Sequence, residues 1–240
     1  EDTYSKTLEE LKVHDINYLR GSDLFKDFQN SRTATIYNDF RSGDPKNFAF
    51  AVDVLRAFIV EQEGGIYSDV DDYYYNMDNE SQNRLGDQSL FATHEELLTL
   101  APVFVPWEPI TAPGALQINN SSFAAHSGNA ILKDVSSEMV IRYNNVFDSK
   151  KYSDDNDFIG AGILERETDN RLSIMTSIVG PRVLTDIYMR HNSNLGPALS
   201  HMTAVHFGAE KPDAQVINKA FETMPLELFI RGGHLGSWKK

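Results

Sequence analysis

Two aspartates, Asp69 and Asp71, lie two positions apart at the end of a short apolar segment. In an extended strand, side chains two positions apart point to the same side, so these two carboxylates emerge together. Neighbouring carboxylates are costly to ionise unless a cation or hydrogen-bond donors offset their repulsion. Mg²⁺ and Mn²⁺ prefer carboxylate oxygens, and Mg²⁺ is commonly held by one or two carboxylates together with substrate phosphates. The pattern therefore indicates a site for a metal-bound diphosphate.

A helix that precedes these carboxylates is the first element needed to position them. The segment from Lys46 onward predicts an amphipathic helix, because four apolar residues recur at helical spacing: Phe48, Val52, Leu55 and Ile59. We expect this apolar face to pack on a sheet. Asp53 and Arg56 lie three positions apart on another side, where neighbouring side chains form one polar unit. Gly64 and Gly65 then end the helix, because glycine adopts the left-handed C-cap conformation without strain.

The second element is a short strand, predicted over Ile66–Asp71. Its alternation separates the side chains into two sets: Ile66, Ser68 and Val70 on one side, and Tyr67, Asp69 and Asp71 on the other. Both carboxylates therefore lie on the same side as a tyrosine.

Three other interpretations of this acidic cluster remain open. Taken alone, such a cluster is most often a solvated turn. A solvated turn does not, however, explain the helix, the Gly-Gly pair and the strand that precede the cluster. A calcium-binding loop would place Asp69, Asp71 and Glu80 at ligand positions, but it requires glycine where Tyr74 stands. Such a loop also follows a helix, whereas a strand is predicted before Asp69. A phosphatase of the DxD type also begins at a strand end, but gives no reason for the preceding Asp-x-x-Arg helix.

The same residues carry a resemblance to a known enzyme family. Three runs are densely matched: YND at Tyr37–Asp39, NFAFAVDVLR at Asn47–Arg56 and GGIYSDVDD at Gly64–Asp72. Together they resemble the DXD region of retaining nucleotide-sugar glycosyltransferases. They are most similar to the glycosylating domains of bacterial cytotoxins of the large clostridial type and of related tyrosine- or threonine-glycosylating toxins, and more distantly to yeast mannosyltransferases. Sparser matches follow: INNSSFAAHSGNAIL at 118–132, GPRVLT at 180–185 and HLGSW at 234–238.

The resemblance implies roles for individual residues of the donor site. Asp53 and Arg56 correspond to the family's pair that holds the sugar hydroxyls and the diphosphate. Asp69 would contact the ribose or the sugar, and Asp71 would bind Mn²⁺ or Mg²⁺. The Ser237-Trp238 pair would belong to a C-terminal loop that covers UDP, to which nearby glycines give the freedom to close.

Three further residues complete the expected site. His234 precedes the covering loop, where relatives commonly place a third metal or diphosphate contact, so the implied metal ligands are Asp71, Asp69 and His234. Asn120 follows a predicted strand, and its amide can donate to and accept from sugar hydroxyls, although Asn-Asn is also simple turn chemistry. Tyr67 is expected to contact the substrate from the same side as Asp69.

The expected fold class is α/β, a GT-A-like nucleotide-sugar transferase fold with a mixed central sheet flanked by helices. We expect residues 1–240 to form a single domain with a polar insertion near 146–172, where the sequence is highly charged without an apolar period. Related transferases begin with an apolar strand that holds the uracil, and nothing before Lys46 reads as such a strand. The domain is therefore expected to lack an N-terminal part or to be trimmed of it.

Other elements follow from local signals. Helices are predicted after the cap residue Ser22, over Ser127–Asn145 with Ser127 as cap, and from Gly180-Pro181 to Arg190. Three short strands are predicted over Ser89–His94, Val103–Trp107 and Leu116–Asn119, with an acidic Glu95-Glu96 turn after the first.

Composition limits the classes of function. The chain has 240 residues, a formal net charge of −13 and no cysteine. This charge argues against nucleic acid as the main partner, because no lysine- or arginine-rich run compensates for it. The lack of cysteine excludes disulfides and thiolate metal sites. No stretch of eighteen apolar residues predicts a transmembrane segment, and the first residues do not have the form of a signal peptide.

The resemblance implies a metal-dependent retaining glycosyltransferase that moves a hexose or N-acetylhexosamine from a UDP-sugar to a hydroxyl of a host protein, such as a small GTPase of the Rho type. Its expected location is that of a secreted bacterial toxin or effector acting in the host cytosol. Two alternatives stay open: a glycan-building hexosyltransferase and a non-catalytic module that binds sugar nucleotides. The residues identify no protein nucleophile, so attack on the same face within an ion pair also stays open.

Overall fold

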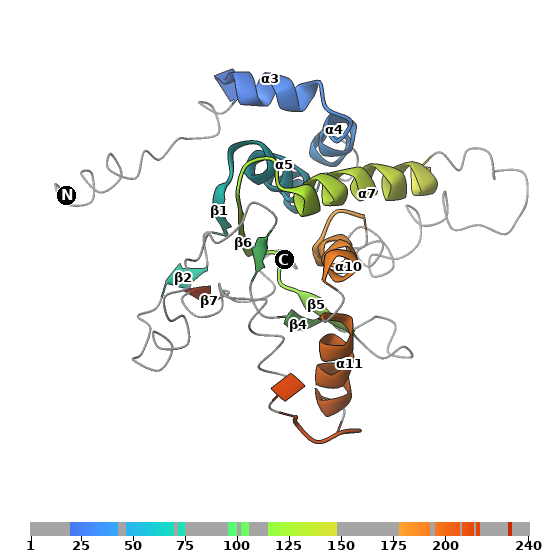
Figure 1. Cartoon of the computed structure of the whole chain (residues 1–240). Coiled ribbons are helices and arrows are strands. Elements are labelled where there is room, and N and C mark those ends of the chain that lie inside the picture. The colour runs from blue at the N-terminus through green and yellow to red at the C-terminus, as the bar shows by residue number, and fades with distance from the viewer. Residues whose placement is uncertain are drawn as a thin grey trace, which may run out of the picture.

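The computed structural model describes residues 20–42, 47–69, 72–74, 96–99, 102–105, 115–147, 178–192, 195–206, 208–213, 215–216 and 230–231. The helices are α3 (Asp23–Gln29), α4 (Ala34–Ser42), α5 (Phe48–Glu63), α7 (Ala130–Phe147), α10 (Pro181–His191) and α11 (Leu195–His206). The strands are β1 (Gly65–Ser68), β2 (Tyr73–Tyr74), β3 (Leu97–Thr99), β4 (Pro102–Val105), β5 (Ala115–Ile118), β6 (Ser122–Ala125) and β7 (Ile230–Arg231). Figure 1 labels these elements.

The helices stack around α5. Figure 1 shows α3 and α4 on one side of α5 and α7 alongside it, with α10 beyond α7, and these neighbours are in contact. Aromatic rings join α3 and α4 to α5. The ring centroid of Phe28 on α3 lies 5.1 Å from those of both Tyr37 on α4 and Phe58 on α5. The start of α3 follows the sequence prediction, since Ser22 Oγ accepts a hydrogen bond from the Phe25 N–H at 3.2 Å.

Helix α5 buries a different set of residues from the predicted apolar face. Phe48 and Val52 are 60% and 42% exposed, whereas Leu55 is buried and Ile59 is half-buried. The prediction was therefore wrong for the first half of the helix. The buried side chains lie on several sides of α5 because α4, α7 and the strands β1 and β6 all pack against it. These side chains are Phe50, Ala51, Val54, Leu55, Arg56, Ala57, Phe58 and Val60.

The strand that follows α5 belongs to a three-stranded antiparallel sheet in the order β1-β6-β3. Ser68 of β1 is opposite Ser122 of β6, and Gly65 is opposite Ala125. All four residues of β6 are buried, so β6 is the inner strand of this sheet. The pairs β4–β5 and β2–β7 are also antiparallel, as is every strand pair among the described residues. The α/β class is confirmed.

The strand predictions hold in part. The segment predicted at 116–119 is β5 at 115–118, and that at 103–107 overlaps β4 at 102–105. Strands β3 and β6 were not expected; β3 begins directly after the predicted Glu95-Glu96 turn. The predicted strand at 89–94 lies outside the described residues.

The long helix α7 begins later than predicted. Its cap is Asn129, whose Oδ1 accepts a hydrogen bond from the Leu132 N–H at 3.1 Å, whereas Ser127 is exposed and precedes the helix. One face of this helix is apolar and buried, through Ile131, Leu132, Val135 and Met139. The helix predicted from Gly180-Pro181 is confirmed as α10, with Pro181 in its first turn.

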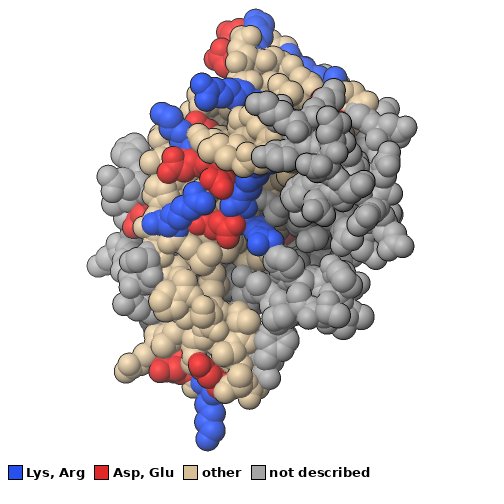
Figure 2. All heavy atoms as spheres, turned by 90° about the vertical axis from the view of Figure 1, so that its right-hand side faces the viewer, with Lys and Arg blue, Asp and Glu red and all other residues tan. Residues whose placement is uncertain are grey.

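Ion pairs join α7 to α10. Arg142 contacts Glu138 on its own helix and Asp186 on α10, both at 2.9 Å, and Arg190 of α10 contacts Glu138 at 3.1 Å. On the face shown in Figure 2, acidic and basic side chains lie interleaved instead of forming a field of one sign. The strongly negative composition therefore does not exclude local charge balance.

Two predictions about the whole chain stay predictions. The single-domain organisation is not tested by the fold, and the predicted insertion at 146–172 lies outside the described residues after its first two positions. Among the residues that the structure describes, no helix combines the length and apolar character needed to cross a bilayer.

The connection between α5 and β1 depends on Gly64. Its φ is +72°, and a Cβ at this position would lie 2.7 Å from the Ser127 backbone nitrogen. The Gly128 N–H donates to the Glu61 carbonyl at 2.6 Å, so the end of α5 lies directly against the loop between β6 and α7. Only a residue without a side chain fits between these two backbones.

We expect Gly64→Ala to lower the free energy of unfolding more than Gly65→Ala, measured by urea denaturation. Both residues have positive φ, which costs a non-glycine residue about 1–3 kcal/mol, but a Cβ at Gly65 has no atom within 4 Å. Gly64→Ala adds a backbone clash to the same strain. Gly21→Ala, which meets neither constraint, should change stability by less than about 0.5 kcal/mol. Equal losses at Gly64 and Gly65 would contradict the close approach.

Candidate functional site

A buried arginine lies at the centre of the candidate site. Arg56 Nη2 forms an ion pair with Asp53 Oδ1, and Arg56 Nη1 lies 3.1 Å from Asp69 Oδ1. The Arg56 side chain is 6% exposed, against 13% for Asp53 and 36% for Asp69. The guanidinium group therefore joins two carboxylates, of which Asp69 is the more accessible.

Two elements bring these three residues together. Asp53 and Arg56 are neighbours on one side of α5, as their spacing predicts. Asp69 follows β1 directly, and its N–H donates to the Ser121 carbonyl at 2.8 Å. Since the Gly64–Gly65 turn folds β1 back beside α5, the end of the strand reaches the helix side that carries Arg56.

Tyr67 completes this cluster from β1. Its hydroxyl donates to Asp69 Oδ1 at 2.5 Å, and the Arg56 Cζ lies 4.9 Å from the centre of its ring. The strand predicted over 66–71 is shorter in the structure, because β1 ends at Ser68. Tyr67 and Asp69 nevertheless meet on one side, as predicted. Burial raises the pKa of Tyr67 to about 12, so its hydroxyl is a hydrogen-bond donor at neutral pH.

Asn120 extends the cluster from the loop between β5 and β6. Its Nδ2 donates to Asp53 Oδ1 at 3.4 Å. The neighbouring Asn119 has a separate part in the loop, because its Oδ1 accepts from the Ser121 N–H at 3.0 Å. The Asn-Asn pair thus combines turn chemistry at Asn119 with a position beside Asp53 at Asn120.

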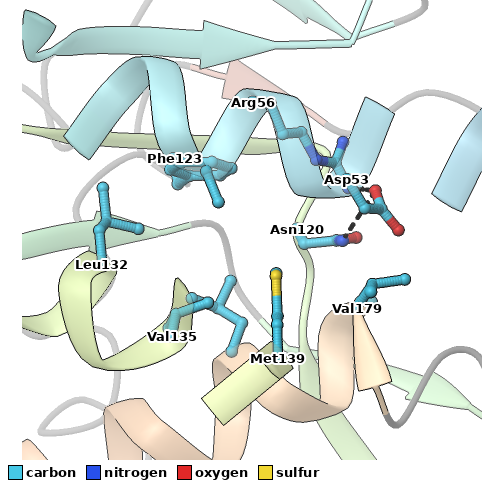
Figure 3. A pocket seen from close by; sticks show the side chains of 11 residues that line it. Asp53, Arg56, Asn120, Phe123, Leu132, Val135, Met139 and Val179 are labelled. Atoms are coloured by element: carbon cyan, nitrogen blue, oxygen red, sulfur yellow. Dashed lines mark hydrogen bonds and ion pairs between the residues drawn. The ribbon is translucent and has the colours of Figure 1, made fainter. Parts of the chain in front are cut away.

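A small pocket opens beside these polar groups, with a volume of about 20 Å³. Figure 3 shows Asp53, Arg56 and Asn120 grouped at one end of it, and apolar side chains toward the other. The apolar lining comes from α5, β6, α7, α10 and the residues just before α10: Ala57, Phe123, Leu132, Val135, Met139, Val179 and Leu184. The volume holds about one water molecule, so a sugar or a nucleotide does not fit inside it.

The two carboxylates differ in how readily they hold a charge. Burial raises the pKa of Asp53 to about 6, more than the attraction of Arg56 lowers it, and the charge on Asp69 raises it further. Burial disfavours the charge on Arg56, but Asp53, Tyr67 and Asp69 outweigh it, so its pKa lies above the ordinary value. Arg56 is therefore always a cation, whereas Asp53 can exchange a proton in mildly acidic solution.

The metal prediction is not tested by these residues. Asp71 and His234 lie outside the described residues, as do Ser237 and Trp238 of the predicted covering loop. Within the described ranges, no group of three or more histidine, aspartate or glutamate side chains is placed to hold a metal ion. Asp69 Oδ1 accepts hydrogen bonds from Arg56 and Tyr67.

The sequence interpretation missed two residues next to this cluster. Ser122, which is fully buried on β6, donates a hydrogen bond from its Oγ to Asp72 Oδ2. Asp72 was treated only as the last residue of the DVDD run. A serine at the start of a short strand carries no local signal of such a contact, because the partner lies 50 positions earlier in the chain.

Comparisons with known proteins give structural likenesses alone. No family model matches the chain, and no curated protein sequence matches it. Similar solved structures include the PaToxG glycosyltransferase, with a TM-score of 0.48, 16% identity and coverage of 88% of this chain and 65% of that one. The UDP-bound glycosyltransferase domain from the YGT toxin has a TM-score of 0.47, 12% identity and coverage of 92% and 66%. The chain thus spans just under two thirds of the length of these two chains.

We expect Asp53 to make the free energy of unfolding depend on pH in a defined direction. Its pKa rises from 3.8 in a model peptide to about 6 in the fold, so the folded chain binds the proton more tightly. The contribution of this carboxyl to the free energy of unfolding is therefore largest below about pH 4. It falls as the pH rises through 6 and then levels off, and the whole decrease is about 3 kcal/mol.

Urea denaturation of the wild type and Asp53→Asn between pH 4 and 8 measures this contribution as a difference. Groups that titrate equally in both proteins cancel in the difference, and asparagine cannot ionise. The stability of the wild type relative to Asp53→Asn should decrease from pH 4 to pH 7. A relative stability that increases with pH would mean that Arg56 outweighs burial at this site.

Proposed function

We propose that the chain is the catalytic part of a retaining glycosyltransferase that transfers a hexose or N-acetylhexosamine from a UDP-sugar to a protein hydroxyl. The observation that carries the proposal is a hydrogen-bonded cluster of five side chains: Asp53, Arg56, Asp69, Tyr67 and Asn120. Three of them, Asp53, Arg56 and Asn120, line the polar end of one pocket. All five are candidate site residues from the sequence, and they come from three separate segments.

The chemistry of this cluster suits a polyhydroxylated ligand. Asp53 and Asp69 provide carboxylate oxygens that accept from sugar hydroxyls, and Asn120 can both donate and accept. Arg56 donates charge-assisted hydrogen bonds to both carboxylates and thereby orients them. Because the pocket holds about one water molecule, we propose that the donor sugar contacts its polar end without filling it.

We further propose that Mn²⁺ or Mg²⁺ accompanies the donor, held by Asp71 together with Asp69 and His234. The metal would supply Lewis-acid stabilisation of the negative charge that develops on the UDP leaving group. We propose that Ser237 and Trp238 cover the nucleotide and exclude water. These assignments are supported by the motif resemblance.

The acceptor is proposed from the same resemblance. We infer a hydroxyl of a host protein, such as a small GTPase of the Rho type, and action in the host cytosol after secretion from a bacterium. The described residues identify no nucleophile, so we propose no covalent intermediate, and same-face attack within an ion pair accounts for retention of configuration.

We expect the chain to bind UDP in the presence of Mn²⁺ and to hydrolyse a UDP-sugar slowly when no acceptor is present. Calorimetry measures the first property, and release of UDP the second. Arg56→Lys keeps the charge but loses the planar fork that contacts both carboxylates, so hydrolysis should fall by about 10- to 100-fold. Asp71→Asn should weaken the binding of UDP only when Mn²⁺ is present.

Arg142→Lys is the matched control, because Arg142 also joins two carboxylates but lies on α7, in the ion-pair network with α10. It should leave hydrolysis within about twofold of the wild type, as expected for partly exposed ion pairs. Equal losses in the two variants would assign Arg56 to folding alone. Binding of UDP without hydrolysis of any UDP-sugar would support a non-catalytic module, and transfer to small saccharides would support a glycan-building enzyme.

A further inference from the structure

Thr185 on α10 contacts the end of β5, the strand that leads into the Asn119-Asn120 turn. The residue is buried. Its Oγ1 accepts a hydrogen bond from the Ile118 N–H at 2.8 Å and donates to the Pro181 carbonyl, also at 2.8 Å. A hydroxyl has one hydrogen to donate and two lone pairs to accept, so both contacts form together. The hydroxyl therefore joins the first turn of α10 to the last residue of β5.

The turn that begins at Ile118 supplies a residue of the candidate site. Asn120 follows Ile118 by two positions, and its Nδ2 donates to Asp53 Oδ1 at 3.4 Å. Between them, Asn119 Oδ1 accepts from the Ser121 N–H at 3.0 Å, which closes the turn around Asn120. Because this bond fixes the shape of the turn, the position of Asn120 depends on that of Ile118.

The start of α10 lies at the same pocket. Gly180 and Leu184 line it together with Asp53 and Asn120, and Leu184 is the residue before Thr185. Helix α10 packs against β5 as well as α7. The contact between α10 and the end of β5 is therefore made beside the polar end of the pocket.

Helix chemistry alone explains only one of the two contacts of Thr185. A helical threonine commonly donates to the carbonyl four positions earlier, and Thr203 on α11 makes this contact with the Leu199 carbonyl at 2.8 Å. The bond between the Ile118 N–H and Thr185 joins residues 67 positions apart. A buried N–H needs an acceptor, and at the end of β5 this acceptor comes from α10.

We propose that Thr185 is a positioning residue of the donor site. It holds the end of β5 so that the Asn120 amide stays beside Asp53, where it contacts hydroxyls of the donor sugar. Thr185 acts through Asn120 and not by contact with the donor. The inference rests on the proposed function, because it assumes that the donor sugar binds at Asn120.

Thr185→Val keeps the size of the side chain but removes the hydroxyl, so the Ile118 N–H loses its acceptor. The affinity for UDP-glucose or UDP-N-acetylglucosamine, whichever the wild type binds more tightly, should fall by about fivefold or more. The affinity for UDP should stay within about twofold, since Asn120 is proposed to contact the sugar and not the nucleotide. Calorimetry with Mn²⁺ measures both. Equal losses for UDP and the UDP-sugar would overturn the proposal, because general damage to the site weakens both.

Two further variants separate the hydroxyl from the fold. Thr185→Ser keeps the hydroxyl and should bind the UDP-sugar within about twofold of the wild type. Thr203→Val is the matched control, because it removes the same intrahelical bond from α11, and it should leave both affinities within about twofold. A loss in either variant as large as in Thr185→Val would overturn the proposal. If Thr185→Val does not fold, Thr185→Ala takes its place, because it removes the hydroxyl without adding a methyl group beside the Ile118 N–H.

A double-mutant cycle tests whether the effect passes through Asn120. Asn120→Ala removes the amide that Thr185 is proposed to position. Adding Thr185→Val to it should therefore weaken the binding of the UDP-sugar no further. Losses that multiply would overturn the proposal, because Thr185 would then act by another route.

Nuclear magnetic resonance provides a readout that does not need the donor. In Thr185→Val the Ile118 N–H should exchange faster with solvent, and the side-chain amide signal of Asn120 should shift, whereas Thr203→Val should change neither. An unchanged Asn120 signal would overturn the proposal. If the wild type binds neither UDP nor a UDP-sugar, the proposed function fails, whereas these signals still decide whether Thr185 positions Asn120.

Discussion

A guanidinium group with 6% of its side chain exposed must have its charge balanced inside the protein, and this requirement organises the site around Arg56. One carboxylate comes from the same helix and the other from the end of β1. The ion pairs therefore join α5 to the strand that follows it, and the stacked Tyr67 ring covers the same group. A buried charge of this kind tolerates little displacement of either element, because the guanidinium group has little solvent to replace a lost carboxylate.

Local chemistry made part of this arrangement predictable. Ser22 is a cap, Gly64 ends a helix and Pro181 begins one. Tyr67 and Asp69 meet on one side of the chain at the end of β1. Each of these outcomes depends on neighbours within a few positions. The grouping of Asp53 with Arg56 follows from helical spacing in the same way. These features include the residues on which the proposed donor site depends.

Other features depend on partners that are distant in the sequence. Phe48 and Val52 have the spacing of a buried face, but α5 is surrounded on several sides further along its length, so the core takes a different set of residues. Asn129 and Ser127 are both good cap residues, and only the course of the loop selects Asn129. The segment Ser122–Ala125 has no strong strand propensity, and its inner position is decided by pairing with β1 and β3.

The position of β6 also affects the order in which the protein can form during synthesis. Ser68 and Ser122 are separated by 54 residues, which a ribosome adds in roughly 3 to 11 seconds at about 5–20 residues per second. During this interval β1 has emerged without the strand that pairs with it, and Asp53 has emerged without Asn120. An unpaired strand edge is open to pairing with other chains. The nascent chain is thus open to misassembly while its proposed donor site is incomplete.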